Sequence, residues 1–142
     1  MSRSMTKMPR LFTAFLLMAP TLGFSADLKV EISDAKFGSG EINVGLFSNA
    51  ASLPKSPVVG QRVAAVDGKA VAIFRNLAPG MYALSAFLDE NANGALDRNV
   101  LGMPTERYGF SRDALGTMGP PNFDVAQFKF ESEDQTQKIQ LR

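Results

Sequence analysis

Residues 81–97 read MYALSAFLDENANGALD, and this segment combines two patterns from which the rest of the chain can be interpreted. In its first half, Tyr82, Leu84, Ala86 and Leu88 alternate with other residues, which predicts a β-strand with one apolar face. In its second half, Asp and Asn occupy every second position before a glycine, a pattern typical of loops that wrap a hard cation. We therefore expect a well-packed strand to carry a metal-binding loop at its end.

The expected ion is Ca²⁺, because it takes roughly six to eight oxygen ligands and a short run of Asp and Asn supplies several of them. A calcium loop that starts at position 89 places side-chain or carbonyl oxygens at alternate residues and a glycine at position 94. The candidate ligands within the loop are Asp89, Asn91, Asn93, Ala95 through its carbonyl oxygen, and Asp97.

The match ends where a bidentate Glu normally closes such a loop, because Val100 occupies that position. Glu90 or Glu106 could complete the coordination shell, and we include Glu106 in the predicted site. An alternative needs no metal: Asn and Gly favour left-handed turns, so the same stretch also fits an Asx-rich hairpin turn.

Residues 1–25 have the pattern of a secretory signal peptide. A basic segment precedes an apolar run over residues 11–19, and small residues up to Ser25 suit cleavage after that residue. The apolar run is well short of the ~20 residues that span a bilayer. We expect a single mature domain, residues 26–142, that is periplasmic or secreted and has no membrane span.

Removal of the leader changes the charge. Lys plus Arg falls from 15 to 12 against 14 Asp plus Glu, so the formal net charge changes from +1 to −2. No basic patch is left that would indicate binding to nucleic acid or to an anionic membrane.

The mature chain reads as short strands separated by turns, which predicts an all-β fold. Apolar residues alternate over residues 28–32 and 42–46. Asp67-Gly68 predicts a tight hairpin that joins residues 61–66 to 69–75. Residues 124–130 fit either one turn of helix or a strand, and the last apolar residues fit a closing strand.

A long Gly- and Pro-rich connection follows the metal loop, and it contains GMPTERYGFS at residues 102–111 and GPPNF at residues 119–123. Together with the loop at residues 89–97, these motifs resemble the bacterial exported family catalogued as domain of unknown function 2141. The resemblance covers essentially the whole mature chain. It implies an immunoglobulin-like or prealbumin-like antiparallel β-sandwich of about seven strands in the periplasm. Leu88 and Arg112 replace a His and an Asn that the family often carries, so no role that rests on that imidazole is expected here.

The composition argues against most catalytic sites. The chain has no His and no Cys, which excludes Ser-His-Asp and Cys-His arrangements, His- or Cys-bound zinc and thiol chemistry. A carboxylate pair such as Glu90 with Asp97 or Glu106 is the remaining option for a hydrolase. Since the chain has no Trp and only 2 Tyr to line a substrate cleft, we expect no enzymatic activity.

Two functions fit the sequence. In the first, Ca²⁺ binds the loop and thereby orders the segment from Val100 to Phe123. In the second, this segment contacts a lipid, a glycan or another envelope protein without a metal. The second function expects Tyr108, Phe110 and Phe123 to be exposed, whereas a purely structural role expects them to be buried.

Overall fold

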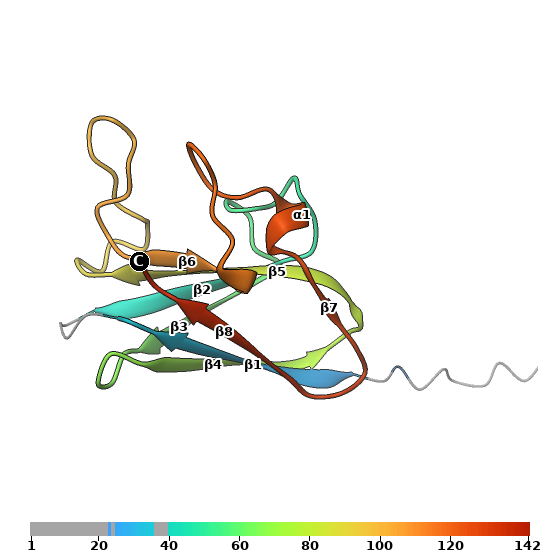
Figure 1. The fold of residues 1–142 in the computed structure, drawn as a ribbon. Helices are drawn as coiled ribbons and strands as arrows, with labels where there is room; N and C mark the ends of the chain where they lie inside the picture. Colours follow the sequence, from blue (N-terminus) through green and yellow to red (C-terminus); the bar gives the residue numbers. More distant parts are fainter. Residues whose placement is uncertain (1–22, 24, 36–39) are drawn as a thin grey trace, which may run out of the picture.

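The computed structural model describes residues 23, 25–35 and 40–142. The predicted leader, residues 1–25, lies almost entirely outside these residues. The described chain is mostly β, with two sheets and two short helices (Figure 1). The elements are β1 (Ala26–Ser33), β2 (Glu41–Phe47), β3 (Val59–Ala64), β4 (Ala70–Leu77), β5 (Gly80–Asp89), β6 (Tyr108–Phe110), η1 (Ser111–Asp113), α1 (Phe123–Ala126), β7 (Phe128–Phe130) and β8 (Gln135–Gln140).

The two sheets enclose one core. The three-stranded sheet has the order β4-β1-β8, and the five-stranded sheet has the order β3-β2-β5-β6, with β7 paired to the start of β5. The alternating residues of β1, β2 and β5 turn their apolar side chains toward this core, as their periodicity predicts. Leu28, Ile42 and Leu84 are among the fully buried side chains.

A second, smaller cluster covers the outer face of the five-stranded sheet. Phe47 and Ala83 lie opposite each other on β2 and β5, and both belong to this cluster. The residues after β6 fold back over them, so that α1 lies above β5 in Figure 1. Phe123 and Ala126 of α1 complete the cluster. Residues 124–130, for which helix and strand were both open, contain the end of α1 and all of β7.

The strand arrangement departs from the expected antiparallel fold in two ways. There are eight strands among the described residues rather than about seven. In addition, β1 and β8 are parallel, with Leu28 opposite Gln135 and Ile32 opposite Ile139. The final strand lies beside the first, and this position places Ile139 and Leu141 in the core between the sheets.

The hairpin predicted at Asp67-Gly68 is correct for the turn and wrong for the strands. Both turn residues have positive φ, 51° and 74°, and the Val66 and Lys69 backbones exchange two hydrogen bonds of 2.8 and 3.0 Å. Beyond this bridge the flanks separate, since β3 pairs with β2 and β4 pairs with β1. The turn therefore carries the chain from one sheet to the other.

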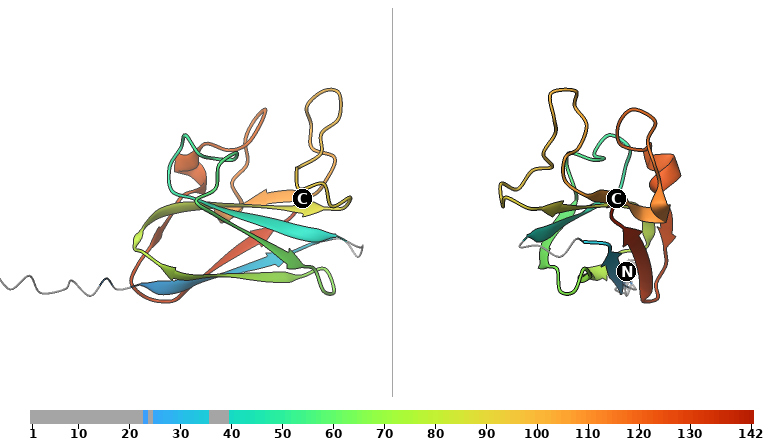
Figure 2. Two further views of the ribbon diagram at one scale, coloured as in Figure 1. Left: turned by 180° about the vertical axis from the view of Figure 1, so that it is seen from behind. Right: turned by 60° about the vertical axis from the view of Figure 1, so that its left-hand side comes forward.

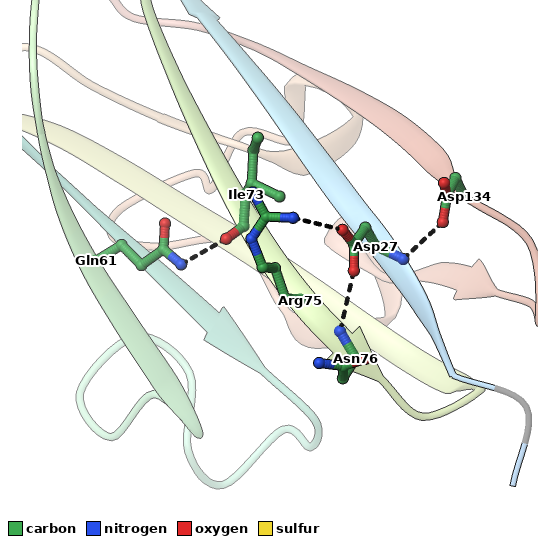
Figure 3. A network of polar contacts seen from close by, with 6 residues as sticks. All are labelled: Asp27, Gln61, Ile73, Arg75, Asn76 and Asp134. Atoms are coloured by element: carbon green, nitrogen blue, oxygen red, sulfur yellow. Dashed lines mark hydrogen bonds and ion pairs between the residues drawn. The ribbon is translucent and has the colours of Figure 1, made fainter.

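Polar contacts fasten the strands at the edge shown in Figure 3. The Asp27 carboxylate accepts hydrogen bonds from Arg75 at 3.0 Å and from the Asn76 N–H at 3.1 Å, and the Asp27 N–H donates to Asp134 at 2.8 Å. These contacts join β1 to β4 and to the start of β8. Between the sheets, the Gln61 side chain of β3 donates to the carbonyl of Ile73 on β4 at 2.7 Å.

The opposite seam between the sheets is joined by backbone. The Arg142 N–H donates to the Tyr108 carbonyl at 2.9 Å, and the Tyr108 N–H donates back to the Arg142 carbonyl at 3.2 Å. The end of the chain beyond β8 thus pairs with β6 of the other sheet. The site described next lies at the end of β5, on the five-stranded sheet.

Candidate metal centre

Asp89 ends β5, and its buried carboxylate organises the loop. The side chain is 2% exposed. Its Oδ1 accepts the Asn93 N–H at 3.1 Å, and its Oδ2 accepts the Gly94 N–H at 2.8 Å and the Asn43 side-chain amide at 3.2 Å. Hydrogen bonds from N–H groups satisfy a carboxylate that is removed from water. Asp89 therefore winds the loop around itself.

Three other predicted ligands meet on the exposed side of the loop. The side-chain amides of Asn91 and Asn93 both donate to the Asp97 carboxylate, the second at 2.8 Å. The oxygens of the same two amides accept backbone N–H groups, from Asn93 at 3.1 Å and from Ala95 at 2.9 Å. These Asx turns are the geometry that the metal-free alternative expects. Positive φ at Ala92, 59°, lets the chain follow them.

Glu106 enters the loop from the following segment but does not face the Asp97 side chain. It is 7% exposed, and its two oxygens accept the Glu90 N–H at 2.9 Å and the Asp97 N–H at 3.0 Å. One carboxylate therefore fixes backbone near both ends of the loop. Val100 lies where a calcium loop normally has a Glu, and in this structure both Glu106 oxygens accept backbone N–H groups.

Five of the six predicted site residues divide into two sets, and the sixth, Ala95, takes part through its backbone. Asn91, Asn93 and Asp97 bring their polar ends together, whereas Asp89 and Glu106 turn theirs toward backbone N–H groups; Ala95 donates its N–H to Asn93. Within residues 23, 25–35 and 40–142, no group of three or more His, Cys, Asp or Glu side chains is placed to hold a metal. A cation at this loop would therefore need amide and carbonyl oxygens as well as carboxylates.

Two residues near the loop were missed by sequence reasoning. Asn43 of β2 donates to Asp89, and Arg62 of β3 lies so close to Gly94 that a Cβ on that glycine would meet its Nη2 at 3.1 Å. The two residues face each other across the β2–β3 pair. Only this strand register brings them to the loop, so no local sequence signal could have identified them.

The geometry gives no support to the carboxylate hydrolase. Both Glu106 oxygens accept backbone N–H groups and hold the side chain against the loop. The two best-defined hollows in the described part of the chain are lined by other residues, one around Gly80 and Phe130 and one around Tyr108 and Leu115. Neither hollow brings together the acids Glu90, Asp97 and Glu106 that the hydrolase hypothesis names.

The aromatic residues of the long connection are largely buried. Phe110 and Phe123 are buried in the cluster on the outer face of the sheet, and Tyr108 is half-buried beside Phe110, with ring centroids 6.1 Å apart at 77°. The exposed apolar side chains near the metal loop are instead Val100, Leu101 and Met103.

None of the helices in the described part of the chain has the length and apolar character needed to cross a membrane.

No curated protein and no solved structure gives a significant match to the chain. A family model described as an uncharacterized protein conserved in bacteria, DUF2141, matches residues 30–139, which include the loop, the long connection and the closing strand. The chain therefore belongs to the bacterial family DUF2141.

Proposed function

We propose that this chain is an exported, non-enzymatic protein that binds Ca²⁺ through the loop from Asp89 to Asp97. One observation carries the proposal: the polar ends of Asn91 and Asn93 meet the carboxylate of Asp97 on the exposed side of the loop. Each of the two amide oxygens accepts one backbone hydrogen bond and retains a second lone pair for a cation, which would displace the amide N–H groups from the Asp97 carboxylate.

In this proposal the predicted site residues have two roles. Asp97, Asn91, Asn93 and the carbonyl of Ala95 are the direct ligands, and water completes the coordination on the exposed side. Asp89 and Glu106 are positioning residues, because their carboxylates hold the loop backbone by N–H contacts.

The expected affinity is low. Asp97 is the one carboxylate among the proposed direct ligands, and low ligand charge weakens Ca²⁺ sites. A dissociation constant of about 10⁻⁴ to 10⁻³ M, as in extracellular calcium modules, fits such a site. This range suits a protein outside the cytoplasm, where the leader at residues 1–25 is expected to direct it.

Binding would stiffen the start of the long connection. The Thr105 N–H donates to the Asp97 carbonyl at 2.9 Å, so the loop is bonded directly to the segment that follows it. A cation held by the Asp97 side chain would restrain this contact and stabilise the folded state by mass action. The fold that carries the loop is proposed to be an immunoglobulin-like or prealbumin-like sandwich, which the two sheets around one core support.

Calorimetric titration tests the proposal. The chain is exported from its expression host with its own leader, its mature N-terminus is verified by mass spectrometry, and bound metal is removed with a chelator. We expect saturable Ca²⁺ binding that Asp97→Asn weakens by at least about tenfold, because this variant removes the ligand charge. Glu90→Gln is the matched control, since it removes the same charge from an exposed side chain in the same loop.

Two results would overturn the proposal. One is the absence of binding heat at millimolar Ca²⁺, which would leave an Asx-rich turn without a metal. The other is equal binding by the wild-type chain and the Asp97→Asn variant.

A further inference from the structure

Two loops that follow β5 expose an unusual set of apolar side chains. The first, residues 98–104, carries Val100, which is fully exposed, Leu101 at 81% and Met103 at 61% exposure. The second, residues 114–121, carries Leu115 at 61% exposure and Met118, which is fully exposed. Large exposed apolar side chains that occur together on one side of a protein indicate a contact site.

The two loops project from the same side of the molecule. In Figure 1 they rise above the five-stranded sheet, away from β4, β1 and β8, and both views in Figure 2 show the same arrangement. Leu115 helps to line the hollow beside Tyr108, whereas Val100, Leu101, Met103 and Met118 line neither of the two hollows described above. Loops that project from the surface can insert their side chains into a binding partner.

The first loop satisfies much of its own backbone. The Asn99 side chain accepts the N–H groups of Leu101 at 2.9 Å and Met103 at 3.1 Å, and the Asn99 carbonyl accepts the Gly102 N–H at 2.9 Å. The Asn99 N–H donates to the Met103 carbonyl at 2.9 Å. Backbone N–H groups that enter hydrocarbon must be bonded internally, because no water is there to accept them. In this loop, the backbone N–H groups of residues 101–103 meet this requirement.

The charge of the two loops is sparse and positive. Residues 98–104, RNVLGMP, contain Arg98 and no acid, and residues 114–121, ALGTMGPP, contain no charged residue. The Arg98 guanidinium donates to the Gly102 carbonyl at 2.9 Å, which holds it against the tip. An Arg beside apolar side chains complements a surface with anionic phosphates over a hydrocarbon layer.

We propose that these two loops dock the exported chain on a phospholipid bilayer, with Val100, Leu101, Met103 and Met118 inserted below the headgroups and Arg98 at the level of the phosphates. A lipid layer accepts the tips of separate projecting loops without a matching groove. The contact is peripheral. The absence of a basic patch gave no reason to expect membrane binding, but here burial of apolar side chains drives the contact. It does not depend on Ca²⁺ binding, since the hydrogen bonds of the tip lie outside the proposed ligand set.

Vesicle flotation tests this proposal. The exported chain, with its mature N-terminus verified, is mixed in chelator with vesicles of phosphatidylcholine alone or with added phosphatidylglycerol. We expect the wild-type chain to float with the anionic vesicles. The double variant Val100→Ser, Leu101→Ser is expected to lower the partition coefficient by at least about tenfold, because two apolar side chains no longer leave water. Arg98→Gln is expected to reduce the preference for anionic vesicles.

The matched control is Val66→Ser, Val71→Ser, which removes two exposed apolar side chains from the 66–69 turn and β4, outside the two loops. It is expected to bind vesicles like the wild-type chain. Thermal melts of both double variants verify that they fold.

Three outcomes would overturn the proposal. In the first, the wild-type chain binds neither kind of vesicle. In the second, the Val100→Ser, Leu101→Ser variant binds as well as the wild type. In the third, the control variant loses as much binding as the Val100→Ser, Leu101→Ser variant. Sedimentation equilibrium identifies the competing occupant: self-association that the loop variant abolishes, without vesicle binding, would assign the loops to a second copy of the chain. Because flotation is run in chelator, its result is independent of the calorimetric test for Ca²⁺.

Discussion

Glu106 is a buried acid whose role is set by two backbone N–H groups. It joins Glu90 to Asp97, and so holds the ends of the loop together from outside it. A single carboxylate can do this because it accepts on both oxygens and needs no donor of its own. The residue is therefore expected to contribute to stability whether or not a cation is bound.

Glu106→Gln is expected to lower the free energy of unfolding by about 1–3 kcal/mol, because the amide places a donor against one of the two N–H groups. Urea denaturation in the presence of chelator measures the change without a contribution from metal. The control is Glu90→Gln, whose side chain is exposed. Equal stability of the two variants would contradict the anchoring role.

Gly109 shows how closely the seam between the sheets is packed. A Cβ at this position would lie 2.6 Å from the Gln140 carbonyl oxygen and 2.7 Å from the Ile139 side chain. Gly109→Ala is expected to destabilise the protein by about 1–3 kcal/mol, because backbone on both sides must shift. Gly119→Ala, which meets nothing within 4 Å, is the control for the same substitution, and thermal melts compare the two.

For individual residues, the sequence predicted which ones share a loop but not the direction of each side chain. Asp89 and Asp97 are both loop carboxylates, yet one faces N–H groups inside the loop and the other faces amides outside it. That difference depends on positive φ at Ala92 and Gly94, which turns the backbone N–H groups toward Asp89. Nothing in the spacing of Asp and Asn specifies it.

Among the elements, Ser111 joins three that are separate in sequence. Its hydroxyl accepts the Leu84 N–H of β5 at 2.9 Å and donates to the Ala126 carbonyl of α1 at 2.6 Å. The side chain is fully buried at the start of η1. It therefore ties the outer cluster to the sheet beneath it.

Ser111→Ala is expected to lower the free energy of unfolding by about 1–3 kcal/mol, because it leaves a buried N–H and a buried carbonyl without this partner. The loss should be local first: amide hydrogen exchange at Leu84 is expected to accelerate more than exchange at Val30 in β1. Ser132→Ala, at an exposed position, is the control. Unchanged exchange at Leu84 would show that the hydroxyl contributes no protection there.

Element positions followed from alternation and turn chemistry, whereas element partners did not. The Asp67-Gly68 turn was predicted correctly because both residues accept positive φ. Its flanking strands were assigned to each other wrongly, because alternation specifies which face of a strand is apolar and not which neighbour completes its ladder. In the structure β3 pairs with β2 and β4 pairs with β1, and these two pairs belong to different sheets.

For the whole molecule, β8 is the strand on which both sheets depend. Its Ile139 is buried in the shared core, β8 pairs with β1, and Arg142 just beyond it bonds to Tyr108 in the other sheet. Ile139→Ala is expected to lower the free energy of unfolding by about 2–5 kcal/mol by leaving a cavity in this core. Ile73→Ala, in β4 of the same sheet but 37% exposed, is the control, with urea denaturation as the measurement. Comparable losses in the two variants would contradict this view of the core.

The parallel pairing of β1 with β8 also sets a time order. Leu28 finds its place opposite Gln135 only when nearly all of the chain is present, so the core cannot close around an incomplete chain. Pairing between such distant segments is slow, because the loop between them must be closed before any contact forms. If the chain is exported as we propose, it would therefore remain unfolded during passage through the membrane and complete its core only after its last strand has crossed.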